Sequence, residues 1–279
     1  MRIIIPQVRS GWDCRANERA VIRSLSKIRG SCDGVVVLPE AVFTGFGNPE
    51  IPSSLLSRRW LELLSNYARS ERLYVYTGSW PEERSRGIRI QVARLLGPDG
   101  RELARVEREI LSDGSTATGD DFPIVESPLG SLGLVLGPDF WLIEPVRIQC
   151  LKGAELLLVS GAITGSRRAA QVAAIWGIAT INTVGIAFAG SLGCGALGGS
   201  SIAMPEGFVG RLEEEDAVVE GDWSRDTIVR VREPDLQFQQ TMWFGLWSRR
   251  PSLYRTLTEV DFSGDERIGM QKCDCEVEA

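Results

Sequence analysis

Short apolar segments alternate with longer segments that repeat their apolar positions at helical spacing along most of this chain. The apolar runs have the length and β-branched content of buried strands: RIIIPQ, GVVVLP, LYVYTGS, IRIQVARLL, LGLVLG, ELLLVSG, VGIAFAG and SSIAMP. Helical patterns lie between several of them, at 15–29, 53–70, 141–152 and 166–180. This alternation predicts an α/β protein whose sheets are buried between layers of helices.

Two segments have the residue types of tight turns. GPDGRE at 97–102 predicts a reversal between two strands, because Pro98 fixes its own φ and the Asp-Gly pair after it tolerates a sharp turn. GFVG at 207–210 is a second candidate for such a turn. Both segments favour antiparallel neighbours at these points of the predicted sheets.

The chain has the length and composition of one large domain. Its 279 residues are 43% hydrophobic, which is enough for a substantial core, and no repeat, low-complexity tract or linker divides them. From about residue 226 polar and apolar residues lose any clear period. We therefore predict a single domain over 1–279, with 226–279 as a C-terminal arm.

The charge balance and the absence of histidine exclude several classes of function. The chain has 31 Lys and Arg against 37 Asp and Glu, a net charge of −6, and no basic stripe, so we expect no binding to nucleic acid. It has no histidine, which removes Ser-His and Cys-His dyads and imidazole metal sites. We expect neither a metal nor a cofactor.

The segment 169–205 carries no charged residue and raises the question of a membrane span. Several glycines and Asn182 interrupt it, so we predict a buried helix followed by a buried strand, and no membrane partner. The N-terminus lacks the apolar stretch of a signal peptide, and the cysteines are mostly scattered along the chain. These features favour a cytoplasmic protein.

Two short motifs each allow a functional and a purely structural interpretation. GCGALG at 193–198 matches a dinucleotide-binding fingerprint, but GGSSIAMPEG follows it and indicates a strand and a turn instead of the required helix. Cys273 and Cys275 could bind a soft metal or form a redox pair, yet no second ligand pair lies nearby. We interpret both segments as structural, and the role of the cysteine pair stays open.

VVVLPEAVFTGF at 35–46 is more informative. A continuous β-branched run ends at Leu38-Pro39, and Glu40 follows at the C-terminal end of the strand, where α/β sheets hold their sites. A solvated strand-end carboxylate is the plain interpretation. The apolar residues on both sides favour burial, which raises the pKa of a carboxyl toward that of a general base.

Together these segments resemble the nitrilase, or carbon–nitrogen hydrolase, superfamily. VVVLPEAVFTGF is similar to its general-base motif and places the base at Glu40. GPDGRELARVEREIL at 97–111 is similar to its turn and lysine-bearing strand, and residues 119–160 to its approach to the nucleophile, its nucleophile elbow and the strand after it. The opening strand and helix, GGSSIAMPEG and RRPSLY at 249–254 extend the resemblance over nearly the whole chain. It implies a four-layer α-β-β-α sandwich.

The sequence departs from the family at two of its three catalytic positions. In LGLVLGPDFW the nucleophile position is occupied by Gly137, and in ARVEREIL the lysine position is occupied by Arg108. Glycine has no atom that can form the covalent intermediate. Arg108 could still offer N–H donors to an oxyanion, but it is bulkier and forked, so we expect it mainly to pair with Glu40 and weaken it as a base.

Other residues could replace the missing groups. Cys194 lies in a Gly-rich loop that, by the resemblance, passes near the site, and a water molecule activated by Glu40 is a second substitute nucleophile. Asp139 follows the elbow and could act in catalysis or cap the next helix. Glu144 resembles a carboxylate close to the family pocket and is a further candidate for its lining.

We therefore expect a catalytically silent homologue with a ligand-binding or scaffolding role, with a small amide- or carboxylate-like ligand. The alternative is an active amidase-like hydrolase that uses Glu40 with water or Cys194. The resemblance also implies homodimers or larger homo-oligomers, packed through the helix after residue 140 and its neighbour. Trp141, Leu142 and Ile143 would suit such an interface.

Overall fold

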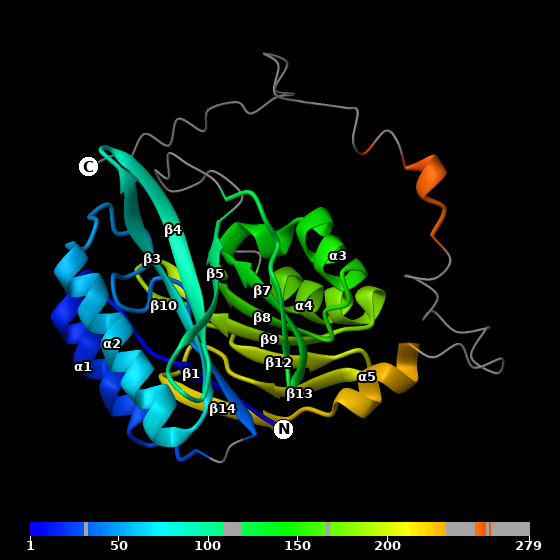
Figure 1. Ribbon diagram of the computed structural model, residues 1–279, viewed down its shortest axis with the longest axis horizontal. Helices are drawn as coiled ribbons and strands as arrows, with labels where there is room; N and C mark the ends of the chain where they lie inside the picture. Colours follow the sequence, from blue (N-terminus) through cyan, green and yellow to red (C-terminus); the bar gives the residue numbers. More distant parts are fainter. Residues whose placement is uncertain (31–32, 109–118, 166–167, 233–248, 255–256, 258–279) are drawn as a thin grey trace.

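The computed structural model describes residues 1–30, 33–108, 119–165, 168–232, 249–254 and 257. Within these residues two six-stranded sheets pack face to face, and helices cover their outer faces (Figure 1). The architecture is therefore the four-layer α-β-β-α sandwich expected from the sequence.

The first sheet has a parallel centre and antiparallel edges. Its strand order is β14 (Ala217–Asp222), β1 (Arg2–Gln7), β2 (Gly34–Val37), β3 (Tyr74–Ser85), β4 (Ile88–Leu96) and β5 (Glu102–Glu107). β1, β2 and β3 are parallel, whereas β4, β5 and β14 join antiparallel. The predicted turn at 97–102 joins β4 to β5, with a hydrogen bond from Gly100 N to Gly97 O of 2.8 Å.

The second sheet follows the same plan. Its order is β13 (Gly207–Arg211), β12 (Ser201–Met204), β9 (Gly185–Gly190), β8 (Leu156–Gly161), β7 (Gly130–Leu136) and β6 (Ile124–Ser127). β7, β8 and β9 are parallel and fully buried, which explains why their sequences are continuously apolar. A small hairpin of β10 (Leu192–Gly193) and β11 (Ala196–Leu197) precedes β12.

Helices lie on both outer faces. α1 (Cys14–Leu25) and α2 (Ser54–Glu71) cover the first sheet, and α3 (Ile143–Leu151) and α4 (Arg168–Asn182) cover the second (Figure 1). Asp13 and Ser53 cap the N-termini of α1 and α2 through their side-chain oxygens, as the residue types predict.

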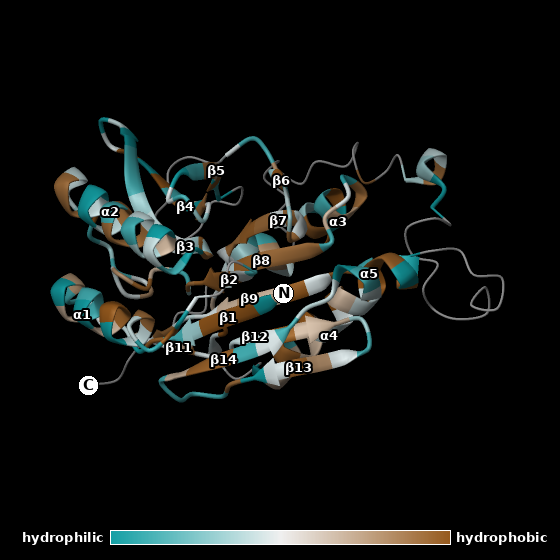
Figure 2. Cartoon of the chain, turned by 60° about the horizontal axis from the view of Figure 1, so that its bottom comes forward, coloured by the Kyte–Doolittle hydropathy of each residue, from teal (hydrophilic) through white to brown (hydrophobic). Residues whose placement is uncertain are grey.

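The hydrophobic core has three layers. One fills the space between the two sheets, a second lies between the first sheet and its helices, and a third lies between the second sheet and its helices. Figure 2 shows the corresponding pattern, with largely apolar strands inside and polar outer faces on α1 and α2. Burial of these strands on both faces is what orients the residues at their C-terminal ends.

Some expectations needed correction. GFVG is not a turn: Gly207–Arg211 is strand β13, and the reversal lies at Pro205-Glu206. The arm expected from residue 226 begins as helix α5 (Arg225–Arg232), whose buried Ile228 packs into the core between the sheets. The periodicity is weak there because the helix is short and mostly polar. Much of the remaining arm, including Cys273 and Cys275, lies outside the described residues.

In the uncharged segment 169–205 the predicted buried strand is β9, whereas the predicted helix, α4, is buried on one face only and exposes Trp176 and Ile181. The segment forms most of α4, then β9, the small hairpin and β12, all packed into the sandwich. GCGALG lies in and around that hairpin and opens no helix. None of the helices in the described part of the chain has the length and hydrophobicity needed to cross a membrane.

Candidate functional site

Glu40 lies three residues beyond the end of β2, at the point where both sheets meet. Its backbone is held from each side: Ala41 N donates to Ser79 O at 3.0 Å on the first sheet. On the second sheet, Ser160 Oγ donates to Leu38 O and Ser191 Oγ donates to Glu40 O, each at 2.7 Å. The carboxylate is therefore positioned by contacts of the neighbouring backbone with three segments, β3, β8 and the residue after β9, and only 3% of the residue is exposed.

Arg108 follows directly after β5 and turns its side chain into the core. Its backbone N–H donates to Gln91 O at 3.0 Å, which extends the pairing of β4 and β5 by one residue. The side chain is 1% exposed, and its Nη2 donates to Glu40 Oε1 in a buried ion pair. The two residues are 68 positions apart in the sequence.

Gly137 lies opposite this ion pair, where β7 ends and a short 3₁₀ helix (Gly137–Trp141) begins. Its φ is +44°, a left-handed conformation that favours glycine. A Cβ added here would lie 2.8 Å and 3.0 Å from the Glu40 carboxylate oxygens and 3.0 Å from Arg108 Nη2. The ion pair thus fills the space into which a side chain at position 137 would project.

Tyr76 is a neighbour of the site that the sequence did not single out. Its hydroxyl donates to Val135 O at 3.0 Å, and the residue is fully buried. Burial raises the pKa of the Tyr76 phenol well above its usual value, and the nearby negative charges of Asp139 and Glu40 raise it further. Alternation in LYVYTGS already places Tyr74 and Tyr76 on one face, but not beside Glu40.

The two acidic candidates after the elbow have different environments. Asp139 is buried at 3% exposure, and its negative charge lies near Tyr76. It does not cap a helix, because α3 begins after Leu142 without a side-chain cap. Glu144 is exposed in the first turn of α3, so the expectation that it lines the buried site is wrong for this chain.

Cys194 and Cys150 lie in different environments, the first exposed and the second buried. Cys194 is exposed at the turn between β10 and β11, and its thiol lies 3.7 Å from Ser10 O. Cys150 is buried in α3, and burial raises the pKa of its thiol to about 12. The structure therefore brings Glu40, Arg108 and Gly137 together, with Asp139 and Tyr76 beside them, and leaves Cys194 at the surface.

The described residues contain no group of three or more His, Cys, Asp and Glu side chains arranged to hold a metal ion. The site contains the Glu40 carboxylate and the Arg108 guanidinium, with the Tyr76 phenol and the Asp139 side chain beside them, all buried. A buried carboxylate that is already paired with a cation is a poor proton acceptor. The pair connects the residues that follow β2 and β5, two strands of the first sheet, and faces Gly137 of the second sheet.

The sequence is similar to omega-amidases. The chain is 28% identical over 142 residues to an omega-amidase of Xenopus laevis, covering 46% of this chain and 51% of that protein. It is 25% identical over 224 residues to the omega-amidase of Xenopus tropicalis, covering 71% of this chain and 79% of that protein. The first match thus spans about half the length of the relative. A scan against protein-family models gives no match.

The fold is similar to solved amidase structures over nearly the full chain. A carbon–nitrogen hydrolase from Helicobacter pylori matches with a TM-score of 0.78 at 18% identity, covering 93% of this chain and 98% of that one. A mutant of an amidase from Nesterenkonia, a protein of the nitrilase superfamily, matches with a TM-score of 0.75 at 22% identity, covering 92% and 97%. The same amidase in complex with butyramide matches at 20% identity with a TM-score of 0.75, covering 92% and 96%.

Proposed function

We propose that this chain, which has the fold of the nitrilase superfamily, is a catalytically silent homologue of carbon–nitrogen hydrolases with a ligand-binding or scaffolding role. The observation that carries the proposal is the buried ion pair between Glu40 and Arg108, which lies where a side chain at position 137 would project. Gly137 has no side-chain atom that could act as a nucleophile, and the ion pair occupies the space that such an atom would need.

The chemistry of the pair supports the same proposal. Covalent amide hydrolysis needs a nucleophile, a base that takes its proton and a donor that stabilises the oxyanion. Gly137 offers no nucleophile, and the carboxylate of Glu40 is engaged by Arg108. The guanidinium is the partner of that carboxylate, so its Nη2 is engaged in the ion pair.

An active amidase is the second candidate, and the comparisons favour it. The sequence is similar to omega-amidases, and the related Nesterenkonia amidase has been solved with butyramide. In this alternative Glu40 activates water, or Cys194 attacks the substrate. The water route requires Arg108 to release Glu40. The thiol route requires the hairpin around Cys194 to move inward, because the thiol is exposed in the present conformation.

Turnover of a panel of small amides, including butyramide and ω-amides of dicarboxylic acids, tests the proposal. We expect no release of ammonia from the natural chain. Turnover that Glu40→Gln abolishes would overturn the silent assignment. The double substitution Gly137→Cys with Arg108→Lys tests whether the pocket is intact but disarmed: it is expected to become labelled at residue 137 by fluoroacetamide, whereas Gly137→Cys alone stays unlabelled because Arg108 fills the space.

Alkylation of the native protein separates the thiol route from the water route. Electrophilic amides are expected to modify the exposed Cys194 no faster than a free thiol in solution, because no catalytic group lies against it among the described residues. Modification of Cys194 that is accelerated over free thiol, and lost with Glu40→Gln, would favour the surrogate nucleophile. Cys194→Ser is the matched control.

We also propose that the chain assembles through α3 and α4, as a homodimer or a larger homo-oligomer in the cytoplasm. Large apolar side chains are exposed on these neighbouring helices, on one outer face of the second sheet (Figure 1). They are Leu142, Ile143, Ile148 and Leu151 on or beside α3 and Trp176 and Ile181 on α4. A cluster of this kind is typical of a protein–protein interface.

A further inference from the structure

The peptide unit between Glu40 and Ala41 is bonded to both sheets. Its N–H, which belongs to Ala41, donates to Ser79 O of β3 at 3.0 Å. Its carbonyl, which belongs to Glu40, accepts from Ser191 Oγ at 2.7 Å. A rotation of this unit would change ψ of Glu40 and φ of Ala41 together. The backbone that carries the Glu40 carboxylate is therefore held by a hydroxyl of the second sheet as well as by a carbonyl of the first.

Ala41 has a backbone conformation that is unfavourable for a residue with a Cβ atom. Its φ is +52°, in the left-handed region. Its carbonyl accepts from Thr44 N at 3.1 Å and from Gly45 N at 2.7 Å, and the residue is buried. Rotation of the 40–41 peptide unit would bring Ala41 to a negative φ. Strained residues persist only where their surroundings hold them, so the bonds of this peptide unit oppose its rotation.

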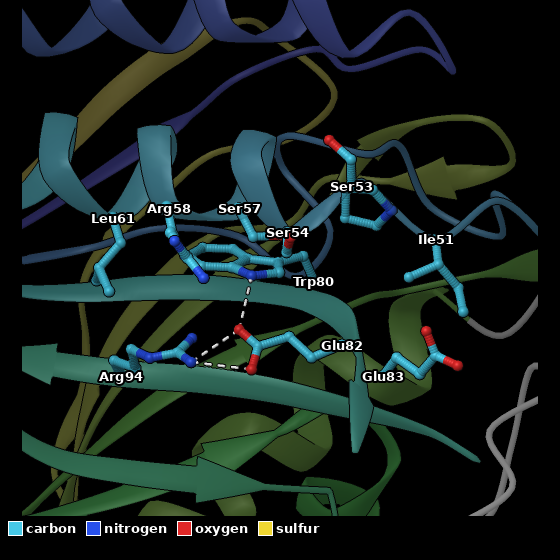
Figure 3. A pocket seen from close by; sticks show the side chains of 11 residues that line it. Ile51, Ser53, Ser54, Ser57, Arg58, Leu61, Trp80, Glu82, Glu83 and Arg94 are labelled. Carbon is cyan, nitrogen blue, oxygen red and sulfur yellow. Dashed lines mark hydrogen bonds and ion pairs between the residues drawn. The ribbon is translucent and has the colours of Figure 1, made fainter. Parts of the chain in front are cut away.

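β3 is irregular where it contacts this segment. Its register with β4 shifts between Tyr76 and Ser79. Gly78 lies within this irregularity with a φ of +70°, and a Cβ there would lie only 2.3 Å from Pro39 O. On the far side of the irregularity Trp80 packs with α2 (Figure 3). Because residue 78 has no side chain, the segment after β2 lies close against β3 and leaves its other side to the second sheet.

Ser191 is itself firmly held in the second sheet. Its backbone N–H donates to Gly161 O at 2.9 Å at the end of the β8–β9 pairing, and its carbonyl accepts from Gly198 N at 2.8 Å. The hydroxyl lies 2.7 Å from Glu40 O and 3.1 Å from Gly161 O. A hydroxyl donates one proton, and Gly161 O already has a donor, so the geometry favours the shorter bond to Glu40. Only 1% of Ser191 is exposed, so bulk water does not compete for this bond.

We propose that Ser191 is a positioning residue of the site: through the 40–41 peptide unit it holds the Glu40 carboxylate against Arg108. Without the hydroxyl this peptide unit loses its bond to the second sheet. The strain at Ala41 then favours a rotation that moves the carboxylate away from the guanidinium. The inference rests on the proposed function for the role of the ion pair, whereas the contacts of Ser191 do not depend on it.

Ser160 is the matched control for Ser191. Its Oγ also donates to a backbone carbonyl of the segment after β2, Leu38 O, at the same distance of 2.7 Å, and the residue is equally buried. The Leu38 carbonyl belongs to a different peptide unit, two residues before Glu40, and Pro39 gives that unit no N–H to be held from the first sheet. We therefore expect Ser160 to stabilise the packing of the two sheets without orienting the Glu40 carboxylate.

A double-mutant cycle shows whether Ser191 acts through the ion pair. Urea unfolding gives the unfolding equilibrium constant of Ser191→Ala and Ser160→Ala, each in the natural chain and in the chain with Glu40→Met and Arg108→Met. We expect Ser191→Ala to raise this constant about a hundredfold in the natural chain but about tenfold without the pair, because a carbonyl loses its donor in both chains. Ser160→Ala should raise it about tenfold in both. Equal effects of Ser191→Ala in the two chains would overturn the proposal.

A crystal structure of Ser191→Ala gives a second result that does not need the chain without the pair. We expect a rotated 40–41 peptide unit, a negative φ at Ala41 and a Glu40 carboxylate beyond hydrogen-bond distance of Arg108, whereas Ser160→Ala keeps the natural geometry. An unchanged Glu40–Arg108 pair in Ser191→Ala would mean that Ser191 has no positioning role. Amide turnover by the natural chain would contradict the proposed function but would alter neither result, so the two failures are distinguishable.

Discussion

The Glu40 carboxylate and the Arg108 guanidinium form a buried ion pair directly in front of Gly137. Each residue depends on the others. Arginine at position 108 has the length and the forked donor geometry to reach the carboxylate, and glycine at position 137 leaves the space that this pair fills. Arg108 and Gly137 are therefore sterically matched, because a Cβ at position 137 would lie 3.0 Å from the Arg108 guanidinium.

Removing one member of the pair should destabilise the protein strongly. Glu40→Gln removes the carboxylate that Arg108 Nη2 binds in a buried ion pair, and we expect the free energy of unfolding to fall by about 3 kcal/mol. Urea unfolding followed by tryptophan fluorescence measures this change. The double substitution Glu40→Met with Arg108→Met should recover most of the loss, because neither charge is then buried alone. A small effect of Glu40→Gln would mean that water reaches the pair.

A methyl group at position 137 should destabilise the protein by more than the backbone strain of a positive φ alone. Gly137→Ala is expected to lower the free energy of unfolding by about 3 kcal/mol, from the positive φ and from contact with Glu40 and Arg108. Gly47 is the matched control, since its φ is +70° and nothing lies within 4 Å of an added Cβ. Gly47→Ala should cost only about 1 kcal/mol. Equal losses in the two variants would contradict the filled site.

The apolar face of α3 and α4 should control assembly. Ile143 is 69% exposed, and Ile143→Asp is expected to convert the natural oligomer into monomers, because a charge in the centre of an apolar interface is costly. Light scattering after size-exclusion chromatography measures the mass. Leu55→Asp is the control, since Leu55 is 75% exposed on α2, on the opposite side of the sandwich. A monomeric natural chain would rule out the interface.

Stability should decline in alkaline solution. Burial raises the pKa of the Cys150 thiol from 9.0 to about 12, and burial raises the pKa of the Tyr76 phenol well above 10.0. The unfolded chain therefore releases these protons at lower pH than the folded chain. Their contribution to stability is complete below about pH 9 and is lost as the pH rises toward the folded-state values.

Urea midpoints between pH 8 and pH 11 measure this decline in about half-unit steps, a range that spans the unfolded-state values. Cys150→Ala and Tyr76→Phe should each make the dependence on pH shallower, whatever they do to stability at neutral pH. A dependence that neither substitution alters would show that other groups cause the alkaline loss.

Much of the fold was accessible from the sequence. The apolar runs from RIIIPQ to SSIAMP became strands, and the helical patterns became α1 to α4 with boundaries shifted by a few residues. These elements follow from local periodicity and from the need to bury apolar faces on both sides of each sheet. GFVG was misjudged, because a short strand has a weak periodic signal.

The sequence by itself determined which residues occupy the three key positions: Glu40 after β2, Arg108 after β5 and Gly137 after β7. Only the tertiary structure decided that Arg108 reaches Glu40 and fills the space before Gly137, that Tyr76 and Asp139 join them, and that Glu144 turns outward. It also decided that Trp80 packs with α2, because β3 is irregular between Tyr76 and Ser79. Local patterns specify which element a residue occupies, whereas contacts between residues as distant as 68 positions depend on how the sheets pack and where a strand is irregular.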